Sequence, residues 1–231
     1  MQRRHFHQAG LGALLLAAWQ QAQALSLADL SGADASSGVK TALGKGAEAA
    51  VALLGRPGGF LDNPQVRIPL PGHLDDAAKL LRKFGQGKRI DELVSTINRA
   101  AEAAVPMGKD LLVNAVQNMT VTDAKNILTG GDTSVTTFFA DKTRLPLGER
   151  FLPVVTQATE KVGLTQQYNR FAGKAASFGL VKKEDANLSQ YVTGKTLDGL
   201  YFMIGEEEKK IRQDPVGTGS AILKKVFGTL K

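Results

Sequence analysis

An all-α fold is predicted by two observations on this chain of 231 residues. Apolar residues recur at intervals of three and four through most of residues 36–212, which is the spacing of one buried helical face. No stretch shows the strict two-residue alternation of a half-buried strand. The sequence therefore predicts a single-domain bundle of about eight or nine helices over residues 36–231, with one long ordered loop rich in proline and glycine.

Residues 1–24 have the features of a removable export signal. Arg3 and Arg4 provide positive charge ahead of an apolar stretch at residues 9–18, which is about half the length that a membrane-spanning helix needs. Residues 22–24 are Ala-Gln-Ala, a small-x-small site of the kind that signal peptidase cleaves. We expect cleavage after Ala24, a location in the periplasm, and a flexible segment at residues 25–35.

The arginine pair, followed by Phe6, resembles the twin-arginine type of signal. Gln2 and His7 depart from that pattern, so the general secretory route stays open beside the twin-arginine route.

Composition excludes several kinds of site. The chain has no cysteine, which excludes disulfides, thiol chemistry and thiolate metal sites. Of three histidines only His73 lies beyond the leader, so a multi-histidine zinc site cannot form within one mature chain. The net charge is +7, and without Arg3 and Arg4 of the leader the mature chain has 27 basic and 22 acidic residues, a mild excess of +5. We expect no bound metal, no cofactor and no nucleic-acid partner.

Helical segments follow in order along the chain. The clearest is residues 89–105, where Ile90, Leu93 and Ile97 share one face and the opposite face is polar. Pro215 ends the longest segment, because the residue before a proline avoids helical angles. The other predicted helices are those at residues 39–54, 74–84, 151–162 and 188–212, a short helix ending at Leu128, and a final amphipathic helix through Ile222 and Phe227.

Residues 55–72, GRPGGFLDNPQVRIPLPG, do not fit a helix, because their prolines and glycines disfavour helical backbone. The segment is too apolar for a flexible linker, since it contains Phe60, Val66, Ile68 and Leu70. We predict an ordered loop that either covers one end of the core or takes part in function.

Several long blocks of the chain resemble a family of exported bacterial proteins catalogued as a domain of unknown function, family 4197. The resemblance implies an exported, mainly helical single domain over nearly all of the mature chain, and it implies no reaction and no catalytic residues. The blocks that carry it are LLGRPGGFLDNPQVRIPLP (53–71), LLRKFGQGK (80–88), NRAAEAAVP (98–106), MTVTDAKNILTGGD (119–132), VGLTQQYN (162–169) and LDGLYFMIGEEEKKIR (197–212).

Residues 120–132 are the densest polar block, and they fit two readings. In the first they are helix punctuation: Thr122 caps a helix with Asp123 in its first turn, Gly130 ends that helix in the left-handed conformation, and Asp132 or Thr133 caps the next. In the second, free amides near Gly130 bind an anion or another ligand. The candidate ligand-binding residues of this block are Asp123, Lys125, Gly130, Gly131 and Asp132.

Asn98, Arg99 and Tyr168 are further candidates, because they place polar groups on otherwise apolar helices. Buried polar groups need partners, which are either hydrogen bonds between helices or a ligand. The acidic run at residues 206–208 is expected to form a solvated face with i,i+4 ion pairs to Lys210 and Arg212.

A basic cluster beside Phe84 offers a different kind of contact. Such a cluster is commonly only solvated, but it is also suited to a peripheral contact with a membrane surface. Its members are Lys79, Arg82, Lys83, Lys88 and Arg89.

The favoured hypothesis is a non-catalytic periplasmic helical protein that binds a small, partly apolar ligand or a partner protein. Two alternatives stay open. One is a hydrolase or lyase that uses carboxylates near Asp123 and Asp132. The other is a structural or interaction protein of the envelope, with residues 55–71 and the final helix as contact surfaces. A deep pocket would favour the first two classes, and a flat apolar patch the third.

Overall fold

The computed structural model describes residues 32–72, 78–79, 82–131, 133–161, 163–177, 179 and 186–213. The expected leader, His73, Asp132 and the expected final helix lie outside these residues. No strand occurs in the described part, which is helical apart from turns and one long loop, so the all-α prediction is confirmed. The elements are α1 (Gly32–Leu54), α3 (Gly87–Ala104), the 3-10 helix η2 (Val105–Gly108), α4 (Lys109–Gln117), α5 (Val121–Thr129), α6 (Ser134–Glu160), α7 (Gly163–Ser177) and α8 (Leu188–Gln213).

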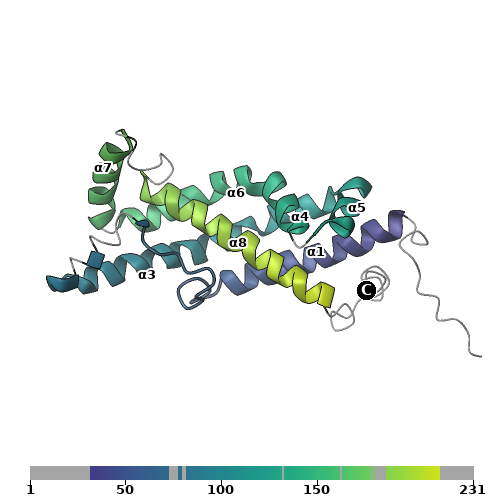
Figure 1. Cartoon of the computed structure of the whole chain (residues 1–231), viewed down its shortest axis with the longest axis horizontal. Coiled ribbons are helices and arrows are strands. Elements are labelled where there is room, and N and C mark those ends of the chain that lie inside the picture. The colour runs from purple at the N-terminus through teal and green to yellow at the C-terminus, as the bar shows by residue number, and fades with distance from the viewer. Residues whose placement is uncertain are drawn as a thin grey trace, which may run out of the picture.

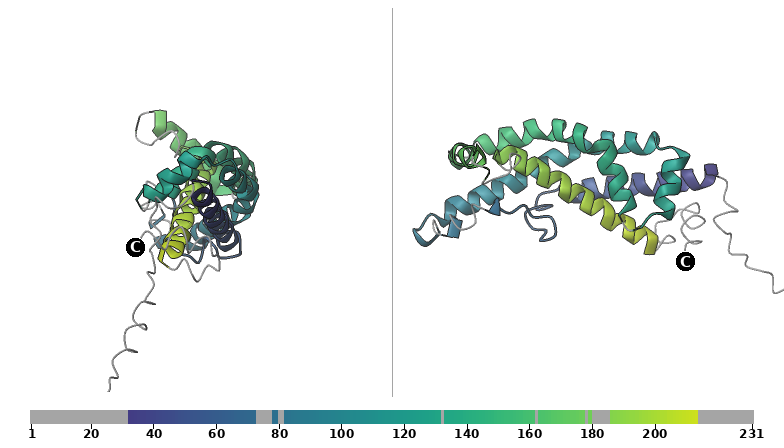
Figure 2. Two further views of the ribbon diagram at one scale, coloured as in Figure 1. Left: turned by 90° about the vertical axis from the view of Figure 1, so that its right-hand side faces the viewer. Right: turned by 45° about the horizontal axis from the view of Figure 1, so that its top comes forward.

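The helices form an elongated bundle in which the long helices pack along one another (Figure 1). Helix α8 packs against both α6 and α1, and α6 also packs against α3. The shorter helices α4 and α5 lie against α1, towards the end of the bundle at which α1 begins (Figures 1 and 2). Large side chains with no exposure fill the space between the long helices, among them Phe139, Phe151, Leu200 and Ile204.

Helix α3 follows the predicted pattern closely. Ile90, Leu93 and Ile97 are buried, as the apolar spacing predicts. The same helix also buries Asn98 and Glu102, whose polar groups are hydrogen-bonded to the long loop. Some polar side chains of α3 thus face solvent, and others bond to the loop.

Helix α6 differs from the prediction. The sequence predicts a helix over residues 151–162 that is separate from one starting near Thr133, whereas Ser134–Glu160 is a single helix of 27 residues. Pro146 and Pro153 lie inside it, each without an amide hydrogen to donate. One helix thus replaces two, and the elements with described bounds are seven α-helices and one 3-10 helix. Most of the predicted helix at residues 74–84 and the whole of the expected final helix lie outside the described residues.

The loop at residues 55–71 consists of turns and extended backbone. Its apolar side chains face the core, with Phe60 and Ile68 almost fully buried. Glu102 of α3 accepts hydrogen bonds from the amides of Phe60 and Leu61, at 3.0 and 3.1 Å. Gly199 lets α8 approach this loop, since a Cβ there would lie 2.8 Å from the ring of Phe60.

Within the described residues, no helix combines the length and the apolar character that crossing a bilayer requires.

Candidate functional site

The start of α5 is fixed by a capping box between Thr120 and Asp123. The hydroxyl of Thr120 accepts a hydrogen bond from the amide of Asp123 at 3.0 Å, and Oδ2 of Asp123 accepts one from the amide of Thr120 at 3.0 Å. The hydroxyl also lies 2.8 Å from the same carboxylate oxygen and donates to it. The prediction that Thr122 caps this helix is wrong. Thr120 has an acidic residue three positions later, where Thr122 has Lys125, so only Thr120 can form the reciprocal pair.

The same bonds determine the charge of Asp123. The backbone amide of Thr120 and then its hydroxyl lower the pKa of the Asp123 carboxyl most, partial burial raises this pKa, and the positive charge of Lys142 lowers it by a smaller amount. Asp123 is therefore a carboxylate at any ordinary pH. Its Oδ2 holds the helix end, while the side chain stands at the edge of a pocket.

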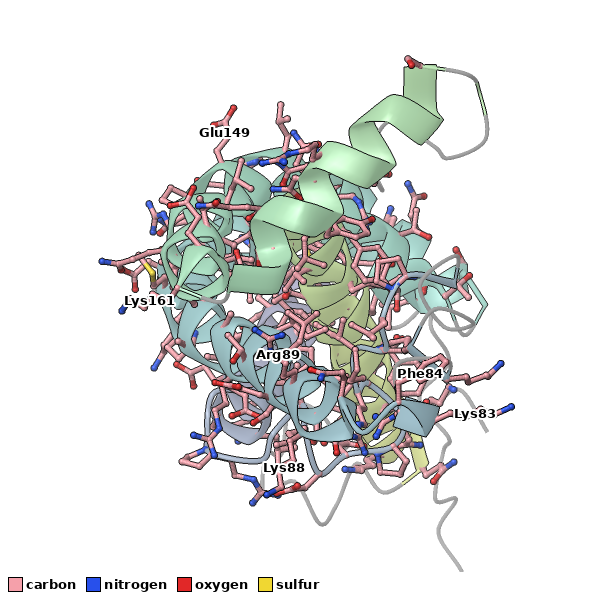
Figure 3. All side chains as sticks on the ribbon, turned by 90° about the vertical axis from the view of Figure 1, so that its left-hand side faces the viewer. Lys83, Phe84, Lys88, Arg89, Glu149 and Lys161 are labelled. Atoms are coloured by element: carbon pink, nitrogen blue, oxygen red, sulfur yellow. The ribbon has the colours of Figure 1, made fainter. Side chains whose placement is uncertain are left out.

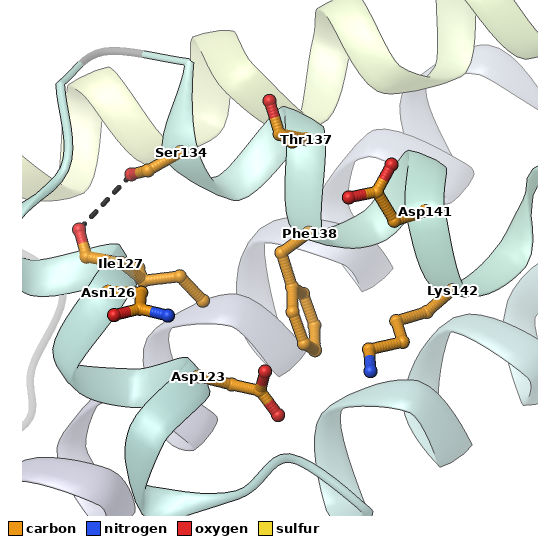
Figure 4. Close-up of a pocket in the computed structure, with 8 residues that line it drawn as sticks. All are labelled: Asp123, Asn126, Ile127, Ser134, Thr137, Phe138, Asp141 and Lys142. Carbon is orange, nitrogen blue, oxygen red and sulfur yellow. Dashed lines mark hydrogen bonds between the residues drawn. The ribbon is translucent and has the colours of Figure 1, made fainter.

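In the connection from α5 to α6, backbone and side-chain atoms pack closely around Gly130. Gly130 has φ −76° and ψ 160°, which is extended backbone, so the predicted left-handed conformation is wrong. A Cβ on Gly130 would lie 2.5 Å from Cβ of Ser134 and 2.6 Å from the carbonyl oxygen of Asn126. Glycine is needed here for space. The hydroxyl of Ser134 donates to the carbonyl of Ile127 at 3.1 Å and joins the two helices (Figure 4).

A pocket of about 430 Å³ lies between α5 and α6 and is the candidate site (Figure 4). The ring of Phe138 lies between the carboxylate of Asp123 and the amine of Lys142 in this view. Phe138 is buried and packs edge-on against Phe139, with ring centroids 5.5 Å apart. The pocket is lined by Asp123, Asn126, Ile127, Ser134, Thr137, Phe138, Asp141 and Lys142.

The structure does not gather the predicted site residues into one place. Asn98 is fully buried and bonded to the loop, and Arg99 is exposed beside a second pocket of about 530 Å³ next to Gly58. Tyr168 is buried in α7. Of the predicted residues that the structure describes, Asp123 alone lines the pocket between α5 and α6. Lys125, exposed on α5, and Gly130 and Gly131 in the connection do not line it, and Asp132 lies outside the described residues.

The residues that the sequence did not single out are Phe138, Asp141 and Lys142. They lie at i, i+3 and i+4 on one face of α6. A search for mixed apolar and charged residues at helical spacing would have found them. No buried face was predicted for the helix that follows Thr133, so this shared face was not identified.

Two further pockets border α8, and Phe202 lines both of them. One pocket, of about 360 Å³, lies between α6 and α8, and the other, of about 380 Å³, lies between α8 and the long loop. Arg144 donates to Asp198 at 2.6 Å across the first pocket. Thr143 lies 3.0 Å from the hydroxyl of Tyr201, whose pKa is raised by burial.

The acidic run of α8 also departs from expectation. Lys209 pairs with Glu206 at 2.7 Å and Lys210 with Glu207 at 2.6 Å, both at i,i+3 spacing, whereas the sequence predicts Lys210 paired with Glu206. The predicted pair of Glu208 with Arg212 falls on a side chain outside the described residues. Glu208 is buried, so the run is not a wholly solvated face. In the part of the chain that the structure describes, no three acidic or histidine side chains meet in a way that would hold a metal ion.

A comparison with protein families matches residues 29–228 to the family described as "Protein of unknown function (DUF4197)". The chain belongs to this family. The match spans the residues that the structure describes, including those that line the pocket between α5 and α6. The DUF4197 family model therefore covers both the helical bundle and the long loop. No curated protein and no solved structure matches the chain.

Proposed function

We propose that this DUF4197 protein is a non-catalytic binding protein that takes a small, partly apolar, positively charged ligand in the pocket between α5 and α6. One observation carries the proposal: a single pocket of about 430 Å³ combines a buried aromatic ring with charged groups on its rim. This volume falls within the range of about 300–1,000 Å³ that is usual for small-molecule sites.

The apolar part of the ligand is inferred from Phe138 and Ile127. Both side chains are buried, and both line the pocket. A ligand that covers the remaining exposed edge of the ring removes apolar surface from water, which contributes about 25 cal/mol for each Å². The ring packs edge-on against Phe139.

The positive charge of the ligand is inferred from the charges of the lining. Asp123 and Asp141 are opposed by Lys142 alone, so the rim carries one net negative charge. The capping box keeps Asp123 ionised because it lowers the pKa of that carboxyl. A cation is therefore attracted to this rim more than an anion is.

Acid–base catalysis is not favoured by the chemistry of Asp123. A general acid or base works best when its pKa lies near the working pH, and the pKa of Asp123 is lowered away from it. Its Oδ2 is also occupied by two hydrogen bonds from Thr120. The carboxylate-dependent hydrolase or lyase therefore has less support than binding.

The loop at residues 55–71 supports a structural role inside the molecule more than a contact role outside it. Its large apolar side chains, Phe60, Val66, Ile68 and Leu70, are all buried. A partner protein that bound this loop would meet mainly prolines and charged residues. An envelope scaffold that uses this surface is thus the weaker alternative.

The periplasm is the proposed location. The support is the leader pattern of residues 1–24, with its arginine pair, short apolar stretch and Ala-Gln-Ala site. In that compartment, a chain without cysteine depends on burial alone for stability.

A matched series of probes tests the charge and the apolar part together. Thermal unfolding would be followed with 2-phenylethylamine, with the neutral 2-phenylethanol and with the anionic 3-phenylpropionate. The proposal predicts that the amine raises the melting temperature most, because only the bound folded state gains from the ligand. Asp141→Asn should abolish that difference, while Glu149→Gln, an exposed acidic position on the same helix outside the pocket, should keep it. Equal shifts with all three probes, or no shift, would contradict the proposal.

A further inference from the structure

The turn at residues 82–85, which precedes α3, exposes an aromatic ring. Phe84 has 73% of its surface exposed. The amide of Gly85 donates to the carbonyl of Arg82 at 3.1 Å and closes a turn, and Gly85 has φ +78°, which a residue with a side chain rarely adopts. Phe84 is therefore held at the apex of a defined turn.

Basic side chains surround this ring. Lys83, Lys88 and Arg89 are exposed, and none of them takes part in an ion pair within the described residues. Arg82 is different, because its guanidinium donates to Asp91 of α3. That pair ties the turn to the helix and leaves three cations facing solvent.

The basic residues and the ring lie at one tip of the molecule. Helix α3 begins at one end of the elongated bundle, and α1 begins at the other (Figures 1 and 2). Viewed end-on, Lys83 and Phe84 project together from one side of that tip, with Lys88 below and Arg89 near its middle (Figure 3). Lys161 and Glu149, both on or beside α6, project from the opposite side of the same view.

We propose that this tip, formed by Lys83, Phe84, Lys88 and Arg89, docks onto the surface of an anionic phospholipid bilayer. Cationic side chains near such a surface are attracted to its negative potential, and an aromatic ring settles at the boundary between headgroups and acyl chains. The tip supplies both the cationic side chains and the aromatic ring, in the turn before α3 and the first residues of that helix. This contact is separate from the pocket between α5 and α6 and does not depend on the ligand.

The shape of the tip favours a lipid surface over an acidic protein. A stable protein partner needs about 800 Å² of buried surface on each side, and it needs complementary relief. A convex turn with one ring at its apex offers little area for such an interface. A bilayer does not require shape complementarity, because its headgroups rearrange around the inserted ring.

Vesicle co-sedimentation of the purified protein tests the proposal. We expect binding to vesicles of phosphatidylcholine with about 30% phosphatidylglycerol, weaker binding as salt rises, and little binding to phosphatidylcholine alone. The double change Lys83→Gln and Lys88→Gln should weaken binding on the order of 25-fold, since each cation contributes about fivefold. Phe84→Ala should weaken it roughly tenfold through the loss of apolar burial.

Two substitutions elsewhere serve as matched controls. Leu145 is 76% exposed on α6, so Leu145→Ala removes an equally exposed apolar side chain and should leave binding unchanged. Lys161→Gln removes one charge at the same end of the molecule and should have little effect. The circular dichroism of every variant should match that of the wild type, because all the altered side chains are exposed.

Insertion of the ring can be observed directly. In a Trp19→Phe background, Phe84→Trp places the only indole of the chain at the tip. Its emission should shift to shorter wavelength with anionic vesicles. The proposal is overturned if the protein does not bind these vesicles, if the controls lose as much binding as the tip variants, or if soluble polyglutamate binds as well as vesicles and without need of Phe84.

Discussion

Asn98 and Ile68 exchange two hydrogen bonds in the buried interior: the amide of Ile68 donates to Oδ1 of Asn98 at 2.8 Å, and Nδ2 of Asn98 donates to the carbonyl of Ile68 at 2.9 Å. Nδ2 also donates to the carbonyl of Val94 at 2.8 Å. One turn further along α3, Glu102 holds the amides of Phe60 and Leu61. A loop without regular structure is thus bound along one helix by side chains that satisfy its buried backbone groups.

Asn98→Ala should therefore destabilise the fold strongly. The substitution leaves the amide and the carbonyl of Ile68 buried without their partners, and each unsatisfied group costs about 1–3 kcal/mol. We expect a loss of about 3 kcal/mol in the free energy of unfolding, measured by urea denaturation. Asn114→Ala, at an exposed position on α4, is the control and should change stability by less than about 0.5 kcal/mol. A similar small effect at Asn98 would show that its bonds to the loop are not maintained in solution.

The connection between α5 and α6 should respond to added volume at one glycine and not at its neighbour. Gly130→Ala brings a methyl group within 2.6 Å of the carbonyl of Asn126 and closer still to Ser134, whereas a Cβ on Gly131 meets nothing within 4 Å. Overpacking of this kind costs about 1–3 kcal/mol. Thermal denaturation should show a lower melting temperature for Gly130→Ala and little change for Gly131→Ala. Equal behaviour of the two variants would contradict the close contact.

Two threonines of α5 provide a matched pair. Thr120→Ala removes the cap and should cost about 1 kcal/mol, while Thr122→Ala, on an exposed position of the helix, should be close to neutral. Equal costs would mean that Thr120 does not cap the helix.

The stabilisation from Asp123 should depend on pH. Because the folded state lowers the pKa of Asp123, the stabilisation is present above the unfolded pKa of about 3.9 and is lost as the pH falls through the folded value. Urea denaturation of the wild type and of Asp123→Ala should differ most near neutral pH, and the difference should shrink in acid. If the difference in unfolding free energy between the two proteins grew as the pH fell, the pKa of Asp123 would be raised in the folded state, contrary to this assignment.

Much of the fold could be predicted from apolar spacing, and its failures have identifiable causes. The pattern of α3 and of α8 predicts their bounds to within two residues, because each has a continuous buried face. The predicted helix at residues 151–162 does not extend back across Pro146, a residue type that ordinarily ends a helix, whereas α6 continues through it and packs against α3 and α8.

The site was less predictable than the fold. The polar block around Asp123 correctly indicated helix punctuation at the pocket, but Gly130 was assigned a conformation where the structure requires space. Asn98 was chosen as a candidate because it is polar on an apolar face, and the structure shows that its partner is a loop 30 residues away. Periodicity within one helix contains no information about such a contact.

The export proposal makes a prediction of its own. Trp19 is the one tryptophan of the chain and lies within the leader. Protein recovered from the periplasm should begin at Leu25 and should show only tyrosine emission. N-terminal sequencing and fluorescence check this directly, and a retained tryptophan band would contradict cleavage after Ala24.

Native mass spectrometry of the protein purified from its own cells tests the central claim most directly. The wild type should carry a small bound molecule if the pocket between α5 and α6 binds the proposed ligand. Asn126→Trp fills this pocket from an exposed lining position and should lose the bound mass, while Asn114→Trp, which lies outside it, should keep the mass. A wild type without any bound molecule, or a bound mass that survives Asn126→Trp, would contradict binding in this pocket.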